Sequence, residues 1–561
     1  MKNLRVALLA ALLLTPPVVA RPDLDLKTTP PDGIATTTVT LADVLGINAR
    51  AEGKPLTSFS TRSEEWSISG GGLASTTRTV WSGKDYKTVD RRGPFVEEDG
   101  RIGGVRWEQN ANGILVIMGG VHQEDEHFEA AMDAARAGTP GDAVKLLGEV
   151  PTPVAAYVVE VRPAGDPPTW LFFDKTSGLL VRREAVFDGV RTTTTYRDFR
   201  TINGATVAGS VTDTNGDTTS DETSTLTSLQ MNVPVPPSQL NLPASKTDLV
   251  QFPAGVSSVQ LPVNMPLSAG TPILLDRDYE ASSSAFRSHI VVRVVINGRG
   301  LDFALDSGAS GILIDKDVAN ELGLKRYGNS GQTLEGEADR SRVIVPEIHI
   351  GDLVMKNVAA FSVPFGMRTA DTEKVVGLLG FDFIASVGLK VDWDKREVTA
   401  FPLGTLPTPA TAITIPLRLD DLVPDVSVSV GDAVGEHFIL DTGAAIAVVF
   451  PDFAKAHPAD LIDQGMGHSI QIFVPYVYLG VVGGVAKAYP VQLKRFVFGV
   501  PFDEFLIDVV DPESHFGGQD MDGLIGYPFL RYFNLYFDYQ NSRILLEPND
   551  QFRKAKHVPQ R

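Results

Sequence analysis

Two short stretches of this chain place an acidic residue in the same setting, an apolar run followed by Asp, a hydroxyl residue, Gly and Ala. The two copies are Asp306-Ser307-Gly308 and Asp441-Thr442-Gly443. One such triplet is weak evidence, because roughly 0.2 to 0.3 matches arise by chance in a chain of this length at ordinary residue usage. Two carboxylates brought face to face, however, can share one proton and act as acid and base at one site. The repeat therefore indicates paired-carboxylate chemistry.

The sequence around the two triplets is repeated as well. A Gly-Leu-Leu/Ile-Gly segment lies downstream of each copy, at residues 377–380 and 523–526. A strand-like segment follows each at equal distance, at residues 391–393 and 537–539. Coincidence in order, spacing and residue type is improbable, so the two halves are interpreted as copies.

The correspondence extends upstream of the triplets. The matched pairs are residues 259–263 with 413–417 and residues 289–296 with 424–430. In both copies the second of these strands passes through a Gly-containing turn into the Asp motif. We therefore predict two versions of one β-rich unit, at residues 256–403 and 409–549. A short helix is expected after each motif, at residues 315–322, ended by Gly323, and at residues 451–456.

Each Asp is delivered by an apolar strand into a glycine turn. Gly lets the backbone approach and turn where a side chain would clash, so the carboxylate oxygens can point outward while their surroundings are buried. The alternative is structural, with Asp accepting hydrogen bonds from nearby amides in a turn. A single copy would favour that alternative, whereas two matched copies favour a catalytic pair.

The two motifs and their Gly-rich segments resemble the aspartic proteases, in particular bacterial retropepsin-like families, here with two units fused in one chain. The resemblance covers residues 256–549, roughly half of the protein. It implies a catalytic dyad of Asp306 and Asp441, which activates water to hydrolyse peptide bonds without a metal or an organic cofactor. It also implies supporting residues that brace the loops or pass behind them: Ser307, Gly308, Thr442, Gly443, Gly380 and Gly526. Ser307 in place of Thr is a familiar variant.

Family members also cover the bound substrate with a hairpin between the Asp motif and the Gly-rich segment. The candidates are residues 328–345 in the first unit and residues 480–489 in the second. Their sequences do not match each other, and ordinary Gly-rich loops remain the alternative.

The region before the repeats has a different pattern. From residue 39 to about residue 229, short alternating stretches are separated by Gly, Asp and Asn turns, which is typical of antiparallel sheet. One helix is expected at residues 124–136. Residues 170–178 and 196–204 loosely resemble bacterial lipoprotein-carrier-like sheet domains. The fold class predicted is mainly β, with an antiparallel sheet domain of limited helix at residues 21–231 before two pseudo-symmetric acid-protease-like lobes.

The two ends of this N-terminal domain are marked by composition. Residues 232–255 are rich in proline among polar residues and predict a semi-rigid linker. At the N-terminus, Lys2 and Arg5 precede a short apolar run and the small-residue pattern that ends at Ala20, so residues 1–20 are interpreted as a removed signal peptide. A membrane anchor is the alternative, but the apolar run at residues 6–14 is shorter than the about 18 to 20 apolar residues that a spanning helix needs. We expect an exported protein, periplasmic or extracellular.

Composition and the absence of known motifs argue against several classes of function. The chain has 561 residues and no cysteine, which removes disulfides, thiol nucleophiles and Cys-ligated metals. A net charge of -19 argues against nucleic acid and anionic membrane surfaces as partners. The chain has no Gly-x-Ser-x-Gly elbow, His-Glu-x-x-His motif or phosphate-binding Gly-Lys loop, which disfavours serine hydrolases, zinc proteases and nucleotide enzymes.

Together these patterns predict an exported aspartic endopeptidase that acts on a peptide or protein substrate, as a monomer. One alternative is a catalytically inactive peptide-binding protein on the same scaffold. Another is a domain-exchanged dimer, which the intact repeat within one chain makes less economical.

Overall fold

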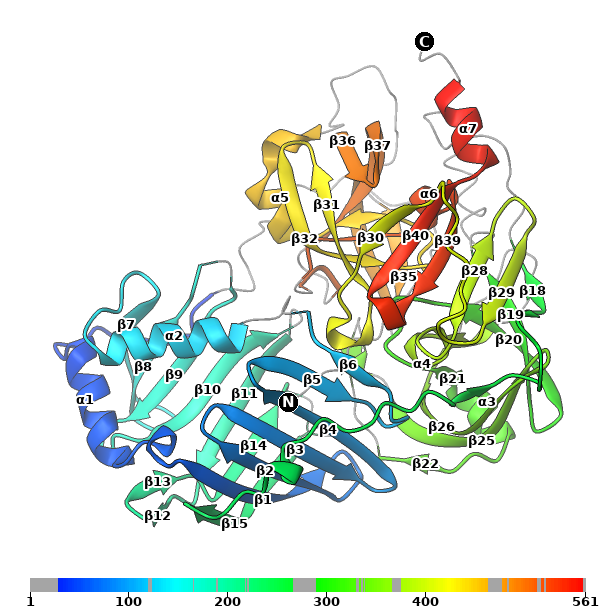
Figure 1. The fold of residues 1–561 in the computed structure, drawn as a ribbon. Helices are drawn as coiled ribbons and strands as arrows, with labels where there is room; N and C mark the ends of the chain where they lie inside the picture. Colours follow the sequence, from blue (N-terminus) through cyan, green and yellow to red (C-terminus); the bar gives the residue numbers. More distant parts are fainter. Residues whose placement is uncertain are drawn as a thin grey trace.

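The computed structural model describes part of the chain. The described residues are 29–557, except for residues 120–123, 165, 188–189, 217, 219–220, 266–288, 329–331, 334–335, 338, 366–374, 463–476, 482–483, 512–515 and 519–520. The predicted signal peptide, residues 1–20, lies outside them. Strands dominate the described residues, which confirms the prediction of a mainly β fold (Figure 1).

The N-terminal part of the chain forms one sheet of 13 strands in the order β6-β5-β4-β3-β2-β1-β15-β14-β11-β10-β9-β8-β7. The strands are β1 (Thr61–Gly70), β2 (Ser75–Ser82), β3 (Asp85–Arg92), β4 (Phe95–Ile102), β5 (Val105–Gln109), β6 (Leu115–Ile117), β7 (Val144–Val150), β8 (Ala156–Val161), β9 (Thr169–Asp174), β10 (Leu180–Phe187), β11 (Val190–Arg197), β14 (Ser210–Thr214) and β15 (Glu222–Met231). Its ladders are antiparallel, as the alternating pattern predicts. A separate hairpin pairs β12 (Arg200–Ile202) with β13 (Ala205–Val207).

Two helices pack on the β7–β10 end of this sheet (Figure 1). Helix α2 (Glu124–Arg136) confirms the predicted helix. Helix α1 (Leu41–Glu52) was not predicted, and the expectation of a single helix here was wrong. The missed signal is a capping box, in which Thr40 Oγ1 accepts from the Asp43 amide (3.2 Å) and the Asp43 carboxylate accepts from the Thr40 amide (3.1 Å).

The first repeat, residues 259–401, is called lobe 1. Its strands belong mainly to a nine-stranded sheet in the order β16-β26-β21-β27-β20-β19-β25-β22, with β18 on β19 and a further β25–β26 pairing. The bounds are β16 (Val250–Gln251), β18 (Val263–Asn264), β19 (Val291–Ile296), β20 (Arg299–Leu305), β21 (Leu313–Asp315), β22 (Arg326–Tyr327), β25 (Ser341–Ile350), β26 (Leu353–Val363) and β27 (Val375–Leu379). Strand β16 comes from the proline-rich segment, so that segment contributes to the sheet.

The second repeat, residues 413–548, is called lobe 2. It has an eight-stranded sheet in the order β31-β32-β38-β33-β37-β36-β34, with β35 on β36 and a β31–β36 pairing. The bounds are β31 (Asp425–Val430), β32 (Ala433–Leu440), β33 (Val448–Val449), β34 (Leu461–Ile462), β35 (Val477–Val481), β36 (Gly484–Phe498), β37 (Val500–Val510) and β38 (Gly523–Ile525). The ladders repeat those of lobe 1, since β20–β27 and β32–β38 are parallel and β21–β27 and β33–β38 are antiparallel.

The helices predicted after the two Asp motifs are present. Helix α3 (Lys316–Glu321) begins at Asp315, whose carboxylate accepts from the amides of Asp317 and Val318, and it is followed by Gly323 at φ +69°. Helix α5 (Pro451–Ala456) begins on a proline, whose missing N–H is no loss at a helix start. Both elements are confirmed as short helices.

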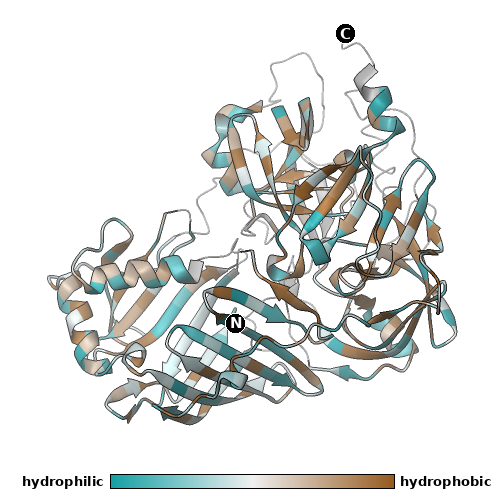
Figure 2. Ribbon diagram, in the orientation of Figure 1, coloured by the Kyte–Doolittle hydropathy of each residue, from teal (hydrophilic) through white to brown (hydrophobic). Residues whose placement is uncertain are grey.

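A six-stranded sheet joins the two lobes in the order β17-β29-β28-β39-β40-β30. The strands are β17 (Val259–Gln260), β29 (Glu397–Phe401), β28 (Gly388–Asp392), β39 (Phe533–Asp538), β40 (Arg543–Pro548) and β30 (Ile413–Pro416). Strand β28 of lobe 1 pairs antiparallel with β39 of lobe 2, so the two repeats meet at the centre of the sheet. Its buried apolar side chains belong to one core cluster that runs through both lobes, and Figure 2 shows hydrophobic stretches alternating with hydrophilic ones along these strands.

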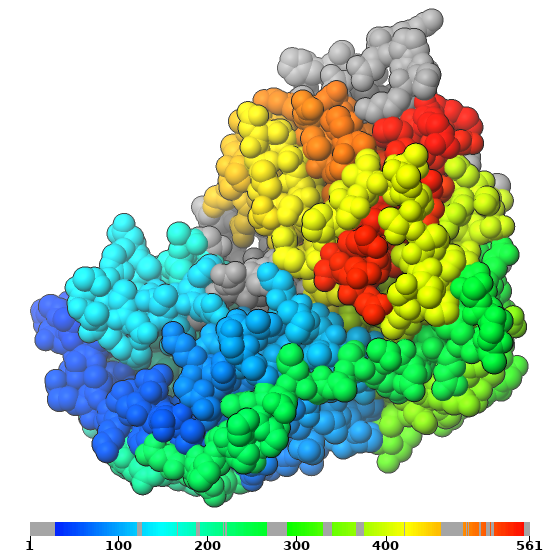
Figure 3. All heavy atoms as spheres, in the orientation of Figure 1, coloured from blue at the N-terminus to red at the C-terminus, as the bar shows by residue number. Residues whose placement is uncertain are grey.

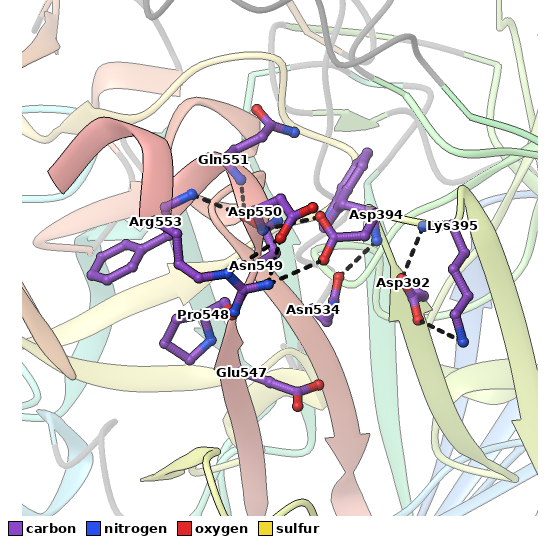
Figure 4. Close-up of polar contacts among 12 residues, drawn as sticks. Asp392, Asp394, Lys395, Asn534, Glu547, Pro548, Asn549, Asp550, Gln551 and Arg553 are labelled. Carbon is purple, nitrogen blue, oxygen red and sulfur yellow. Dashed lines mark hydrogen bonds and ion pairs between the residues drawn. The ribbon is translucent and has the colours of Figure 1, made fainter. Parts of the chain in front are cut away.

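The last described element is a helix that contacts both lobes. Asn549 caps α7 (Asp550–His557), because its side-chain oxygen accepts from the amides of Gln551 and Phe552 (3.0 and 3.1 Å). The Asp394 carboxylate of lobe 1 accepts from the Asp550 amide (3.0 Å), as Figure 4 shows. These contacts hold the end of lobe 2 against the turn between β28 and β29.

Candidate active site

The two acidic residues follow directly on equivalent strands. Asp306 comes after β20 and its amide donates to the Leu379 carbonyl (3.0 Å), while Asp441 comes after β32 and its amide donates to the Ile525 carbonyl (2.9 Å). Both residues are fully buried. Each Asp loop is therefore held by the strand of the Gly-rich segment that runs parallel to its own strand.

The hydroxyl residues after the two acids connect the loops. The Ser307 amide donates to Thr442 Oγ1 and the Thr442 amide donates to Ser307 Oγ, each at 3.0 Å. The hydroxyls in turn donate to the carbonyls before the opposite acids, Ser307 to Leu440 (2.8 Å) and Thr442 to Leu305 (2.9 Å). The two loops thus bind each other through four buried hydrogen bonds across the lobe boundary.

The glycines bring the two carboxylates together. Gly308 and Gly443 each donate an amide to the Oδ1 of their own motif's Asp, at 3.0 and 2.7 Å. A Cβ on Gly308 would lie 2.7 Å from Oδ2 of Asp441, and a Cβ on Gly443 would lie 2.6 Å from Oδ2 of Asp306. Each carboxylate therefore occupies the space that a side chain on the opposite loop would need.

Burial sets the electrostatics of the pair. It raises the pKa of Asp441 to about 6, against hydrogen bonds from Asp306 and from the Gly443, Gly308 and Ala444 amides, which lower it. Two adjacent buried carboxyls cannot both ionise cheaply, so they titrate as a coupled pair. Below about pH 6, such a pair retains a proton and presents an acid and a base together.

Gly380 and Gly526 lie directly against the Asp loops. A Cβ on Gly380 would lie 2.3 Å from the Gly311 carbonyl oxygen, and one on Gly526 would lie 1.8 Å from the Ile446 carbonyl oxygen. Each glycine precedes a short helix, α4 (Phe381–Ile384) or α6 (Tyr527–Leu530), whose first amide donates to the Asp loop at 2.8 Å. Close approach, rather than an unusual φ, requires glycine at both positions.

Two aromatic pairs that join the lobes across their boundary were not predicted from the sequence. Phe381 of α4 stacks on Tyr539 of lobe 2 (ring centroids 6.2 Å), and Tyr527 of α6 packs edge-on against Trp393 of lobe 1 (5.4 Å). The signal was present, because the residues after both Gly-rich segments and after both Val/Phe-Asp pairs are aromatic. These contacts tie the support of each Asp loop to the other lobe.

The lobes differ in the strand beside each Asp loop. In lobe 1 Phe361 pairs with Leu313, and in lobe 2 Asp508 pairs with Val448 at the equivalent position. Asp508 is buried, and burial raises its pKa to about 7. The sequence reasoning did not single out this residue, because its equivalence to Phe361 depends on strand register.

Both cover candidates fall on hairpins. Within residues 328–345, β23 (Gln332–Thr333) pairs with β24 (Gly336–Glu337), and residues 329–331, 334–335 and 338 lie outside the described residues. Residues 480–489 span the β35–β36 hairpin, and residues 482–483 lie outside them. Covering of a substrate by these hairpins stays a prediction.

The described residues offer neither a cluster of metal ligands nor a membrane-spanning helix. In that part of the chain, no group of three or more His, Asp or Glu side chains is arranged to hold a metal ion. Among the helices that the structure describes, none is long and apolar enough to cross a membrane.

Comparison with protein families gives a match within lobe 1. Residues 292–383 match the family model described as aspartyl protease, a stretch that begins in β19, contains Asp306 and ends in α4. Residues 292–383 are thus an aspartyl protease-like region. The comparison with curated proteins gave no match.

Three solved structures that are similar to parts of this chain come from bacteria. A protein of the DUF1329 family from Desulfovibrio piger (13% identity, TM-score 0.27) covers 36% of this chain and 98% of its own. A LolA superfamily protein from Nitrosomonas europaea (11% identity, TM-score 0.26) covers 36% of this chain and 99% of its own. A retropepsin-like aspartic protease from Rickettsia conorii (19% identity, TM-score 0.17) covers 26% of this chain and 89% of its own.

Proposed function

We propose that the protein is an exported aspartic endopeptidase in which Asp306 and Asp441 form the catalytic dyad. The observation that carries the proposal is the mutual approach of the carboxylates, each in the space opposite a glycine of the other lobe. The aspartyl protease match over residues 292–383 supports the same reaction class. A structural role in turns would not require the two loops to meet.

In the proposed reaction the dyad holds one proton. The ionised carboxylate accepts a proton from a water molecule as its oxygen attacks the peptide carbonyl carbon, and the protonated carboxyl donates to the carbonyl oxygen. When the tetrahedral intermediate collapses, the C–N bond breaks, the protonated carboxyl donates to the leaving amine, and the ionised carboxylate accepts a hydroxyl proton of the intermediate, so that the dyad again holds one proton. The raised pKa of Asp441 favours retention of the shared proton in mildly acidic solution.

The supporting residues have proposed roles that follow from their contacts. Ser307 and Thr442 hold the two loops at a constant separation through their four hydrogen bonds. Gly308 and Gly443 leave room for the opposite carboxylates, and each glycine amide orients the Oδ1 atom of the Asp in its own motif. One chain supplies both carboxyls, so a monomer is sufficient for the reaction.

The proposed organisation keeps the sequence-based boundaries. It has an N-terminal β-rich domain at residues 21–231, a linker at 232–255 and two protease lobes at 256–403 and 409–549. Export requires removal of residues 1–20, which N-terminal sequencing of the mature protein would test. A mature chain that still begins at Met1 would contradict the export proposal.

The test of the reaction uses a mixed peptide library incubated with the purified protein between pH 3 and pH 8. Asp306→Asn and Asp441→Asn should each lower hydrolysis by on the order of a thousandfold, because neither leaves a carboxyl pair that shares a proton. Asp352→Asn is the matched control, since Asp352 is exposed on the turn between β25 and β26. Undiminished hydrolysis in either dyad variant would overturn the assignment, and peptide binding without hydrolysis by the wild type would favour the inactive binding protein.

A further inference from the structure

The N-terminal sheet contacts lobe 1 through the turn between β5 and β6. Ile114 and Val116, at 5% and 4% exposure, belong to the core cluster that runs through the two lobes. Figures 1 and 3 show the N-terminal strands lying against lobe 1. The turn at residues 110–114 thus packs against lobe 1, with Asn112 and Ile114 buried and the other three residues half-buried.

Asn110 in this turn reaches a buried acid behind the first Asp loop. Its Nδ2 donates to Oδ1 of Asp382 (2.8 Å), a residue of α4 that is 3% exposed. The other oxygen of Asp382 accepts from the amide of Ile312 (3.1 Å). Ile312 follows the Asp306 loop, so a side chain of the N-terminal sheet is two hydrogen bonds away from the loop backbone.

Asn112 holds the neighbouring strand of lobe 1. Its Oδ1 accepts from the Ala359 amide (2.8 Å) and its Nδ2 donates to the Ala359 carbonyl (2.9 Å). In the same strand, the Phe361 amide donates to the Ile312 carbonyl (2.8 Å). The Ile312 amide is therefore held by Asp382, which Asn110 contacts, and the Ile312 carbonyl by β26, the strand that Asn112 contacts.

A second contact lies at the base of the β23–β24 hairpin. The Glu97 carboxylate of β4 pairs with the Arg342 guanidinium of β25 (2.8 Å). Phe95, also in β4, packs edge-on against Tyr327 of β22 (ring centroids 5.5 Å). The N-terminal sheet thus touches lobe 1 both behind the Asp loop and beside the strands that carry the hairpin.

The two lobes differ at the residue that Asn110 contacts. The repeat aligns Gly380-Phe381-Asp382 with Gly526-Tyr527-Pro528, so lobe 2 has proline where lobe 1 has Asp382. A buried carboxylate is unfavourable unless donors satisfy it, and burial raises the pKa of Asp382 to about 6. The neighbouring Asn112 side chain and the hydrogen bonds from the Ile312 amide and Asn110 lower that pKa in turn. The carboxyl of Asp382 is therefore suited to a hydrogen-bond donor from the N-terminal sheet. Lobe 2 has no carboxyl at the equivalent position, Pro528.

We propose that the β5–β6 turn is a positioning element for the first Asp loop, with Asn110 acting through Asp382 on the Ile312 backbone. The inference rests on the proposed function and assigns the N-terminal sheet a part in it. Asn110 is a positioning residue, since it contacts neither carboxyl of the dyad directly. Loss of its hydrogen bond leaves Asp382 with one donor fewer and lets the loop shift relative to Asp441.

The test compares full-length variants by kcat per active site, with sites counted by titration with a tight-binding peptide inhibitor. Asn110→Ala should lower kcat about tenfold or more with KM changed less than threefold, because small displacements of a reacting group reduce turnover strongly. Asn241→Ala is the matched control, since Asn241 is exposed in the segment between the N-terminal sheet and lobe 1. A merely structural role would reduce the number of active sites but leave kcat per site unchanged.

A donor–acceptor exchange keeps the test decisive if Asn110→Ala folds poorly. Asn110→Asp alone places two acids together and should lower kcat at least as much as Asn110→Ala. The double variant Asn110→Asp with Asp382→Asn restores a hydrogen bond with donor and acceptor exchanged and should recover kcat to within about threefold of wild type, by double-mutant logic. Unchanged kcat in the single variants, or no recovery in the double variant, would overturn the proposal.

A further measurement separates this inference from the proposed function. If the wild type hydrolyses no peptide, the proposed function fails, and carbon-13 NMR of the Asp carboxyls still reports the state of the Asp pair. Asn110→Ala should then shift the apparent pKa values of the Asp306–Asp441 pair, whereas the control Asn241→Ala should not. Identical titrations in the two variants would overturn the positioning role.

Discussion

Ser307 and Thr442 each accept a hydrogen bond from the other's amide, at 3.0 Å in both directions. Each hydroxyl then donates to the carbonyl that precedes the opposite Asp. All these groups are buried, so no water can replace a partner that is lost. The relative position of the two carboxylates is therefore set by two hydroxyls, one from each lobe.

Removal of one hydroxyl should destabilise the lobe boundary. Thr442→Val leaves the Ser307 amide and the Leu305 carbonyl without their present partner, and each buried unsatisfied group costs about 1 to 3 kcal/mol. We expect a loss of about 2 to 5 kcal/mol in the free energy of unfolding, measured by chemical denaturation. Thr442→Ser keeps the hydroxyl and serves as control, and equal denaturation midpoints for the two variants would contradict the prediction.

Alanine at the supporting glycines should disrupt the Asp loops. Gly526→Ala and Gly380→Ala place a Cβ within 1.8 and 2.3 Å of a loop carbonyl oxygen, so the backbone must move. We expect melting temperatures well below wild type and loss of hydrolysis. Gly46→Ala in α1 is the control, because its Cβ would meet only the Arg50 side chain at 3.6 Å and Ala is a better helix former than Gly. A wild-type melting temperature in both loop variants would be inconsistent with the packing described.

Hydrolysis should depend on pH through the shared proton. The pKa of Asp441 is raised to about 6, so the pair retains a proton below that pH and loses it above. The value of kcat/KM should therefore fall as pH rises through about 6. A profile of kcat/KM between pH 4 and pH 8 checks this, and a rate that increases up to pH 8 would rule out the shared-proton pair as the catalytic form.

Stability should decrease from acidic to neutral pH. Burial raises the folded-state pKa of Asp382 to about 6 and of Asp508 to about 7, above their ordinary value of 3.8. An acid with a raised folded-state pKa contributes stability that is complete below its unfolded pKa and is lost as pH rises through the folded value. The window of loss thus lies between about pH 4 and pH 7.

Asp508→Asn isolates one part of this effect. The amide side chain of this variant cannot ionise. The free energy of unfolding at pH 8 should therefore be higher for the variant than for wild type, by on the order of 2 to 4 kcal/mol for a pKa shift of this size. Denaturation curves at pH 5 and pH 8 provide the measurement. A wild type that is equally stable at both pH values, or a variant with the same pH dependence as wild type, would argue against a buried Asp508 carboxyl.

Several local features could be predicted because they depend on nearby residues. Asp315 and Gly323 mark the ends of α3, and the Pro451 start of α5 was readable in the same way. Helix α1 was readable too, from Thr40 and Asp43, but the alternating pattern around it favoured strand. Caps and turns act over three or four residues, which is why such elements need no tertiary information.

By itself, the sequence determined that two copies of an Asp motif exist, each with its own supporting glycine, because repetition is visible without coordinates. Only the tertiary structure decided that Ser307 and Thr442, 135 residues apart, bind each other, and that Asn110 reaches Asp382 across 272 residues. A hydrogen bond between distant segments depends on strand register and on the pairing of β28 with β39. Register follows from the packing of the whole core, so no local pattern specifies it.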